Sequence, residues 1–206
     1  MKTLLKFALV IFCVFTFFQA NSQVLFGPKV GLNLSTLTMK SSGMSIDPKT
    51  MTGFNVGLVC EIPIKANFFL QPGFIYSTKG SKYTVSGETM SISPTFIEIP
   101  VNGLVKFGAG SAKFLIFAGP YFAYGIGGSY KTPTESADIN YGSGSNHDMK
   151  PFDIGLNIGA GVEINHFMIT VQYGFGLANL APVTDNDTEM KLGVIGISMA
   201  YMFGAK

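Results

Sequence analysis

The sequence predicts an all-β fold in which eight antiparallel strands close into an up-and-down transmembrane β-barrel with a filled lumen. Two alternating apolar–polar runs lie between residues 152 and 180, joined at Asn165 and His166. Such alternation marks strands with one apolar face. Each run is long enough for a tilted membrane-spanning strand of about 9–11 residues. Apolar residues make up 47% of the chain and charged residues 13%, whereas a soluble domain carries about 25% charged residues.

The two runs predict a hairpin with an apolar outer face and a small, polar inner face. The outer set is Phe152, Ile154, Leu156, Ile158, Ala160 and Val162, followed by Phe167, Ile169, Val171, Tyr173, Phe175 and Leu177. The inner set includes Asp153, Gly155, Asn157, Gly159, Gly161 and Glu163. A narrow lumen favours residues without side chains, which explains the inward glycines.

The first 22 residues predict a secretory signal peptide, which leaves residues 23–206 as the barrel domain. Lys2 and Lys6 precede an apolar core, and Ser22 ends a small-residue cleavage site. An anchoring helix is the alternative, but the apolar run is well short of the roughly 20 residues that span a membrane. After residue 23 no apolar run reaches the length of a spanning helix, so the predicted spans are strands.

Charge and cysteine content exclude several function classes. The chain has no arginine, and removal of Lys2 and Lys6 takes the formal net charge from +2 to zero. A basic patch for nucleic acid is therefore not expected. Cys60 is the only cysteine after the signal peptide, so neither an internal disulfide nor a cysteine-based metal site can form. We expect no cofactor.

Patterning along the chain places the eight strands and their connections. The expected strands are 24–35, 52–62, 68–79, 95–107, 113–125, 152–164, 167–177 and 190–203. The expected long loops are 36–50, 80–94, 127–150 and 178–189, and short turns lie between them. Long outer loops alternating with short periplasmic turns are typical of outer-membrane barrels. Both faces of 113–125 are apolar, so its orientation stays open. A soluble β-sandwich also alternates, but its polar face would carry more Lys, Glu and Thr.

Aromatic residues near the predicted strand ends indicate the girdles that flank a membrane-spanning apolar band. This set is Phe26, Phe54, Phe68, Phe69, Phe107, Tyr121, Tyr124, Phe167, Tyr173 and Tyr201.

Charged residues on the predicted inner faces form the candidate site. They are Lys29, Glu61, Glu98, Lys106, Asp153 and Glu163, accompanied by Asn33, Asn55, Asn102, Asn157 and Gln172. One interpretation is a proton or ion path. The favoured one is a structural polar network, because an eight-stranded barrel is only wide enough for its own side chains and buried charges need partners.

Other motifs indicate no catalytic or metal site. His147 lies in a predicted loop and His166 in a predicted turn at the opposite end, which argues against a two-histidine metal site or a catalytic triad within one chain. Weak metal binding around His147 is less favoured than a solvated loop. Asp185–Asp187 suggests calcium, but Gly and Glu do not follow at EF-hand spacing, so we predict a solvated loop.

Several segments, taken in order, resemble the PorT-type outer-membrane β-barrel family of Bacteroidetes. They are Phe26 to Ser35, Gly53 to Gly80, Phe96 to Pro100 followed by Lys106, Phe117 to Tyr121, Gly159 to Glu163 and Tyr173 to Leu177. The resemblance covers essentially the whole mature chain and implies an eight-stranded outer-membrane barrel. It implies no single activity, although the namesake is linked to protein secretion.

Three functions follow as hypotheses. The first is a non-enzymatic, monomeric outer-membrane barrel with a structural, adhesion or accessory role, whose loops contact a partner and whose wall contacts lipid. The second, implied by the family's namesake, is a component of a secretion or outer-membrane assembly apparatus. The third is a lipid-modifying barrel enzyme, which would need a serine or histidine pairing at the lipid-facing rim. A small-solute pore ranks last because the lumen should be filled.

Overall fold

The computed structural model describes residues 24–41, 44–46, 48–85, 88–108, 110–183 and 188–204. The predicted signal peptide at residues 1–22 and the Asp185–Asp187 segment lie outside the described residues. Within the described part, the regular elements are strands, and no helix there is long and apolar enough to cross a membrane.

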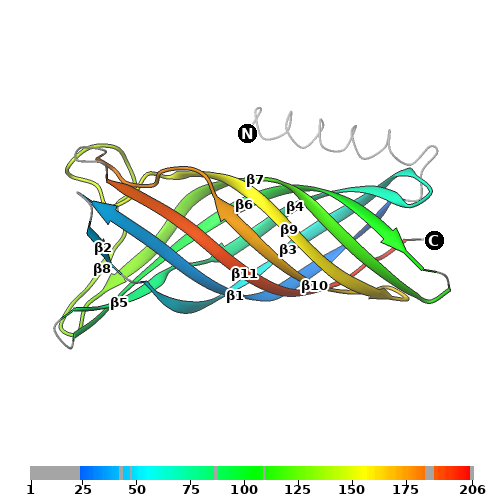
Figure 1. The fold of residues 1–206 in the computed structure, drawn as a ribbon, viewed down its shortest axis with the longest axis horizontal. Helices are drawn as coiled ribbons and strands as arrows, with labels where there is room; N and C mark the ends of the chain where they lie inside the picture. The colour runs from blue at the N-terminus through cyan, green and yellow to red at the C-terminus, as the bar shows by residue number, and fades with distance from the viewer. Residues whose placement is uncertain are drawn as a thin grey trace, which may run out of the picture.

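Eight long strands form a closed antiparallel ring (Figure 1). They are β1 (Leu25–Ser41), β3 (Lys49–Lys65), β4 (Phe68–Thr78), β6 (Glu88–Phe107), β7 (Ala112–Lys131), β9 (Phe152–Ile164), β10 (Phe167–Gly176) and β11 (Glu189–Tyr201). Each strand pairs with the next one in the ring, and β1 pairs with both β3 and β11, which closes it. The predicted up-and-down order of eight antiparallel strands is therefore confirmed.

Three short strands extend the hairpins at one end of the ring, which we call the loop end (Figure 1, left). They are β2 (Met44–Ile46), β5 (Ser81–Val85) and β8 (Ser136–Asp138). The predicted loops at 36–50 and 80–94 are therefore wrong, because strands fill most of both segments. Strand also occupies the start of the predicted loop 127–150, where β7 continues to Lys131. Of the predicted loop 178–189, the described residues 178–183 and 188 lie between β10 and β11, and Glu189 begins β11.

The physical reason for this error is that a strand beyond the apolar band no longer needs an apolar outer face. Thr and Ser then stand on the outer face, and period-two alternation disappears from the sequence. The backbone still pairs, as the register of Lys40 with Glu189 in β1 and β11 shows. Strand pairing depends on the backbone partner and not on side-chain polarity alone.

Short turns join the strands at the opposite end, which we call the turn end and where the C-terminus lies (Figure 1, right). Asn165 in the β9–β10 turn has a φ of 54°, a left-handed conformation that Asn tolerates better than most residues. Phe203 follows β11 and bridges Phe26 of β1 through two backbone hydrogen bonds of 2.7 and 3.1 Å. This bridge fastens the chain end to the first strand.

The two faces of the wall follow the predicted parity. In β9, Phe152 is 70% exposed and Ile158 is 56% exposed, whereas Asp153 is 3% exposed. Strand β7, whose orientation the sequence left open, turns Leu115, Phe117, Tyr121 and Ala123 inward. The predicted girdle is wrong at two positions: Tyr121 is buried inside the ring, and Phe69 packs against the inner apolar cluster.

Candidate functional site

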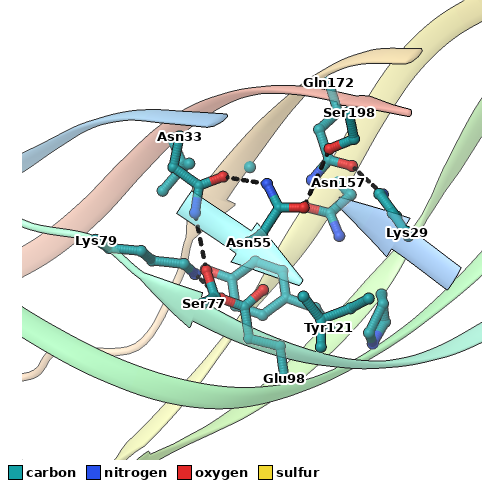
Figure 2. Close-up of a pocket in the computed structure, with 14 residues that line it drawn as sticks. Lys29, Asn33, Asn55, Ser77, Lys79, Glu98, Tyr121, Asn157, Gln172 and Ser198 are labelled. Carbon is teal, nitrogen blue, oxygen red and sulfur yellow. Dashed lines mark hydrogen bonds and ion pairs between the residues drawn. The ribbon is translucent and has the colours of Figure 1, made fainter. Parts of the chain in front are cut away.

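A polar chamber lies inside the ring (Figure 2). Its cavity measures about 30 Å³, which is room for one or two water molecules. Amide and serine side chains from six strands line it, namely Asn33, Asn55, Ser77, Asn157, Gln172 and Ser198. We call this cavity and its lining the polar chamber.

The lining amides bond to one another across strands. Asn55 Nδ2 donates to Asn33 Oδ1 at 2.8 Å, and Asn33 Nδ2 donates to Ser77 Oγ at 3.0 Å (Figure 2). Ser198 Oγ on β11 donates to Asn55 Oδ1 at 3.2 Å. Buried polar groups are stable only when they are hydrogen-bonded. This chain of bonds therefore ties β1, β3, β4 and β11 together through the interior.

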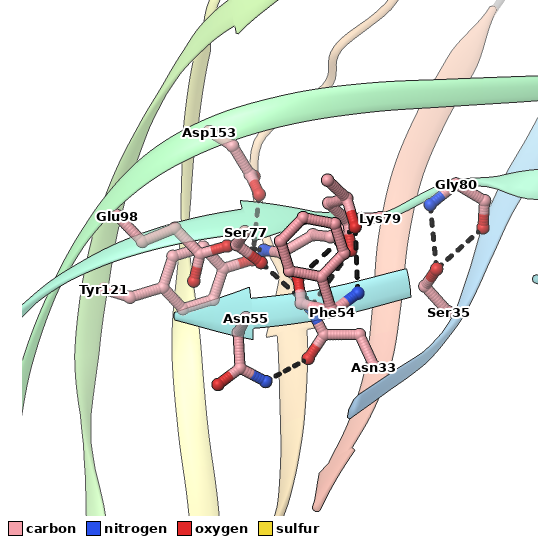
Figure 3. A network of polar contacts seen from close by, with 11 residues as sticks. Asn33, Ser35, Phe54, Asn55, Ser77, Lys79, Gly80, Glu98, Tyr121 and Asp153 are labelled. Carbon is pink, nitrogen blue, oxygen red and sulfur yellow. Dashed lines mark hydrogen bonds and ion pairs between the residues drawn. The ribbon is translucent and has the colours of Figure 1, made fainter. Parts of the chain in front are cut away.

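Charged side chains form the wall of the polar chamber on its β4, β6, β7 and β9 side (Figure 3). Lys79 Nζ lies 2.6 Å from Glu98 Oε1 and 4.7 Å from the centre of the Tyr121 ring. The Tyr121 hydroxyl donates to Asp153 Oδ2 at 2.9 Å. Lys79 is thus paired with a carboxylate and also packs against an aromatic face, both of which stabilise a buried ammonium group.

Near the turn end, Lys106 lies between two carboxylates, and we call Glu61, Lys106 and Glu163 the turn-end ion cluster. Lys106 Nζ donates to Glu163 Oε2 at 2.5 Å and also to Glu61 Oε1. All three side chains are buried. The Lys106 ammonium also lies 4.6 Å from the centre of the Phe69 ring. The ammonium offsets the repulsion between the two carboxylates.

The six charged residues predicted for the lumen are thus divided between two places. Three of them form the turn-end ion cluster, and Glu98 and Asp153 take part in the charged wall of the polar chamber. Lys29 lines the chamber separately and donates to Gln172 Oε1 at 3.4 Å. The predicted set is therefore not one continuous network.

Sequence reasoning missed two members of this site, Lys79 and Tyr121. Lys79 follows Ser77 by two residues, so the alternation of the predicted inner face already carried a signal for it. Tyr121 had no such signal, because both faces of β7 are apolar. Its inward orientation depends on Gly155, its register partner on β9, where a Cβ would stand 2.5 Å from the Tyr121 ring.

Apolar clusters border the polar chamber on both sides along the ring axis. The turn-end cluster contains Leu25, Val59, Leu104, Leu115, Phe117, Met168 and Met202. The loop-end cluster contains Leu37, Phe96, Tyr121, Ala123, Ile139, Met149, Leu180 and Leu192. Three of its members, Ile139, Met149 and Leu180, come from the loop-end connections and are 7%, 1% and 0% exposed. The connections therefore fold back over the mouth.

Backbone hydrogen bonds hold these connections in place. Lys150 N donates to Leu180 O at 2.8 Å, and Gly144 N donates to Pro182 O at 3.0 Å. The Tyr141 hydroxyl donates to Gly127 O at 2.9 Å. Burial raises the pKa of Tyr141 to about 12, so this phenol stays a hydrogen-bond donor at physiological pH.

The two histidines do not come together. His147 lies in the loop-end connection before β9. His166 lies in the β9–β10 turn, where its ring stacks on the Tyr201 ring with the two ring centres 5.8 Å apart. Among the described residues, no three His, Cys, Asp or Glu side chains could hold a metal ion together. The chemistry of the interior is that of paired charges and hydrogen-bonded amides.

Comparison with known proteins gives a family and a set of similar structures. The profile of the family described as "Outer membrane protein beta-barrel domain" matches residues 17–181. No curated protein matches the sequence.

Three solved structures illustrate the similarity. Ail of Yersinia pestis, crystallised with the heparin analogue sucrose octasulfate, is 14% identical over 88% of this chain and 99% of its own, with a TM-score of 0.44. Neisserial surface protein A is 12% identical over 85% and 97% of the two chains, with a TM-score of 0.44. The outer membrane enzyme PagL is 13% identical over 82% and 98%, with a TM-score of 0.43.

Proposed function

Because this chain belongs to the outer membrane protein beta-barrel domain family, we propose that its ring spans the outer membrane as a closed, lumen-filled barrel and that its loop end is a non-enzymatic contact surface. The role is structural, adhesive or accessory. The observation that carries the proposal is the buried position of Ile139, Met149 and Leu180, which places loop side chains over the mouth of the ring.

The outer face supports the membrane placement. Aliphatic side chains dominate its middle, including Leu32, Leu58, Ile116, Ile158, Val171 and Ile197, each between 47% and 61% exposed. Aromatic residues stand toward both ends of this band. Tyr201 contacts Phe167 and Phe203 at the turn end, with ring centres 4.9 and 4.7 Å apart. Tyr124 contacts Phe152 nearer the loop end at 4.9 Å. Apolar bands flanked by aromatic girdles are typical of outer-membrane barrels.

The interior supports a filled lumen. An eight-stranded barrel leaves an interior just wide enough for its own side chains. Here the turn-end ion cluster and the charged wall of the polar chamber pair their charges within the ring. Apolar clusters lie on both sides of the chamber. We infer that these side chains stabilise the barrel and that Lys29, Glu61, Glu98, Lys106, Asp153 and Glu163 are structural rather than a path for ions.

The loop end supports the contact role. Strands such as β6 and β7, with 20 residues each, exceed the 9–11 residues needed to cross the membrane. The wall therefore continues into water as a stiff sheet that holds the connections. A pre-ordered surface costs less conformational entropy when a partner binds. We propose that the barrel acts as a monomer and that the connections around 139–151 and 177–183 contact an external partner.

Two finer assignments complete the proposal. We propose PorT-type membership on the ordered segments that resemble that family, and export through removal of residues 1–22. N-terminal sequencing of the membrane-extracted protein tests the second. A mature chain that starts near Gln23 supports it, and a chain that retains the apolar run contradicts it.

The main experiment compares gel mobility of unheated and heated protein and measures conductance in a planar bilayer. A closed, filled barrel shifts in mobility on heating and carries no steady current. The matched variants are Leu180→Asp, which places a charge in the loop-end cluster, and Leu177→Asp, which places it at a position that is 56% exposed. Steady conductance of the unmodified protein contradicts the filled lumen, and an unchanged mobility contradicts the barrel. Antibody fragments against residues 139–151 that fail to reduce cell attachment would contradict the adhesion role.

A further inference from the structure

Three lysines form a row across the outside of the wall at the loop end, and we call Lys49, Lys82 and Lys131 the lysine row. Lys49 of β3 lies directly opposite Lys82 of β5. Lys82 lies opposite Ser91 of β6, which in turn lies opposite Lys131 of β7. Since neighbouring strands are about 4.8 Å apart, the three lysines lie within roughly 15 Å on one level.

The lysine row faces away from the interior. All three lysines are exposed. The residues on either side of Lys82 in β5, Ser81 and Tyr83, are 0% and 5% exposed, and the Tyr83 hydroxyl donates to the backbone oxygen of Leu37 inside. Lys49 Nζ donates to Thr84 Oγ1 at 2.9 Å, which places its ammonium group on the same outer face as Lys82.

The lysine row makes no ion pair with a carboxylate of the described part of the chain. Among the described residues, none of the three lysines has a carboxylate within 4.0 Å. The described acidic residues nearest by register are Glu135, next to Ser136 opposite Lys131, then Asp138 of β8, opposite Ser129 of β7, and Glu88 at the start of β6. Like charges directly opposite each other destabilise a sheet. A bound anion would relieve the repulsion between Lys49 and Lys82.

The height of the row indicates the kind of anion. Phe54 and Ile126 are apolar residues of the outer face and are 48% and 50% exposed. Toward the loop end, Lys49 lies five residues from Phe54 along β3, and Lys131 lies five residues from Ile126 along β7. Five residues of a strand tilted by about 40° rise roughly 13 Å. An ordinary headgroup layer is only about 5–8 Å thick on each side of the hydrocarbon core. The row thus faces sideways into a zone that only a larger lipid headgroup fills.

We propose that the lysine row binds the phosphorylated saccharide headgroup of an outer-leaflet glycolipid and fixes one side of the barrel to that lipid. The inference goes beyond the proposed contact role of the connections and depends on the loop end facing outward. The lysine stems can lie along the wall while their ammonium groups reach phosphates in the headgroup layer. Exposed Thr84 and Thr89, paired on the same face, add hydroxyl donors for the saccharide.

The test titrates diphosphoryl lipid A into the full-length mature protein in zwitterionic micelles, with calorimetry as the readout. The test variant is K49Q/K82Q/K131Q. The matched control is K40Q/K65Q/K191Q, which removes the same charge. Lys40 lies opposite Glu189, Lys191 contacts Glu189 at 3.3 Å, and Lys65 ends β3 at the turn end. Heat-modifiable mobility of each variant verifies that the barrel is folded, independently of lipid binding.

We expect each lysine to contribute about fivefold to the affinity, so the test variant should lose roughly a hundredfold while the control stays within about threefold of the unmodified protein. Lipid A without phosphates should bind as weakly as the test variant does. Equal losses in test and control variants would overturn the site and leave only a net-charge effect. Tighter binding of soluble dextran sulfate than of lipid A would overturn the lipid as the occupant.

Discussion

Gly155 of β9 lies directly opposite Tyr121 of β7, and a Cβ at Gly155 would stand 2.5 Å from the Tyr121 ring and 2.1 Å from the backbone oxygen of Phe175. The glycine therefore makes the space in which the ring lies inside the barrel. The ring in turn carries the hydroxyl that bonds Asp153 and a face that contacts Lys79. One residue without a side chain thus sets the position of the charged wall.

Replacement of Gly155 by alanine is expected to lower the free energy of unfolding by about 1–3 kcal/mol, because overpacking displaces the ring or the neighbouring backbone. Denaturant unfolding in lipid vesicles measures the change. Gly127→Ala is the matched control, since no atom lies within 4 Å of a Cβ there. Equal destabilisation by both variants would contradict the packing explanation.

Tyr121→Phe should also destabilise the barrel, by about 1–3 kcal/mol, because it leaves Asp153 Oδ2 without its hydroxyl donor in a buried position. Asp153 Oδ1 already has no hydrogen-bond partner within the described structure. Tyr124→Phe on the lipid-facing side is the control, because that side chain is 48% exposed. A neutral surface change alters the unfolding free energy by about 0.5 kcal/mol. If the unfolding free energies of the two variants agree within about that amount, the Tyr121 hydroxyl does not stabilise the barrel as a donor to Asp153.

The sequence predicted the spanning part of the fold well and the site in part, and particular residues show why. In β9, outward Ile158 and inward Asn157 differ in polarity, so alternation reveals both faces. In β7, outward Phe122 and inward Tyr121 are both aromatic, and only the partner strand decides between them. The loop-end strands were missed because alternation stops where the wall leaves the lipid. The split of the polar residues into two clusters depends on strand register, which no single strand encodes.

The depth dependence of a charge on the outer face tests the membrane placement. Val171→Lys, in the middle of β10 at 51% exposure, is expected to cost about 2–4 kcal/mol of unfolding free energy. Ile164→Lys, at the end of β9 with 49% exposure, is expected to cost about 0–1 kcal/mol. Unfolding in vesicles of defined lipid gives both values. The same cost at both depths would contradict a membrane around this band.

Loss of the central ammonium group should make the turn-end ion cluster unstable. Lys106→Met is expected to cost about 3–5 kcal/mol, because it leaves the Glu61 and Glu163 carboxylates facing each other without their shared cation. The triple variant that also carries Glu61→Gln and Glu163→Gln should recover most of this loss. Lys65→Met on the exposed end of β3 serves as the control. Failure of the triple variant to recover stability would show that Lys106 acts through packing on Phe69 instead.

Alkaline titration tests how firmly the connections are packed over the mouth of the barrel. Burial raises the pKa of Tyr141 from 10.0 to about 12. A raised pKa in the folded state means that this burial stabilises the fold fully below pH 10 and that the contribution is lost as pH rises through about 12. Tyrosinate absorbs at about 295 nm, so absorbance at this wavelength is titrated for the unmodified protein and for Tyr141→Phe. Subtraction of the second curve from the first should show one ionisation centred near pH 12. A midpoint near pH 10, the ordinary value for an exposed phenol, would mean that Tyr141 is solvated and that the connection between β8 and β9 does not stay folded into the mouth.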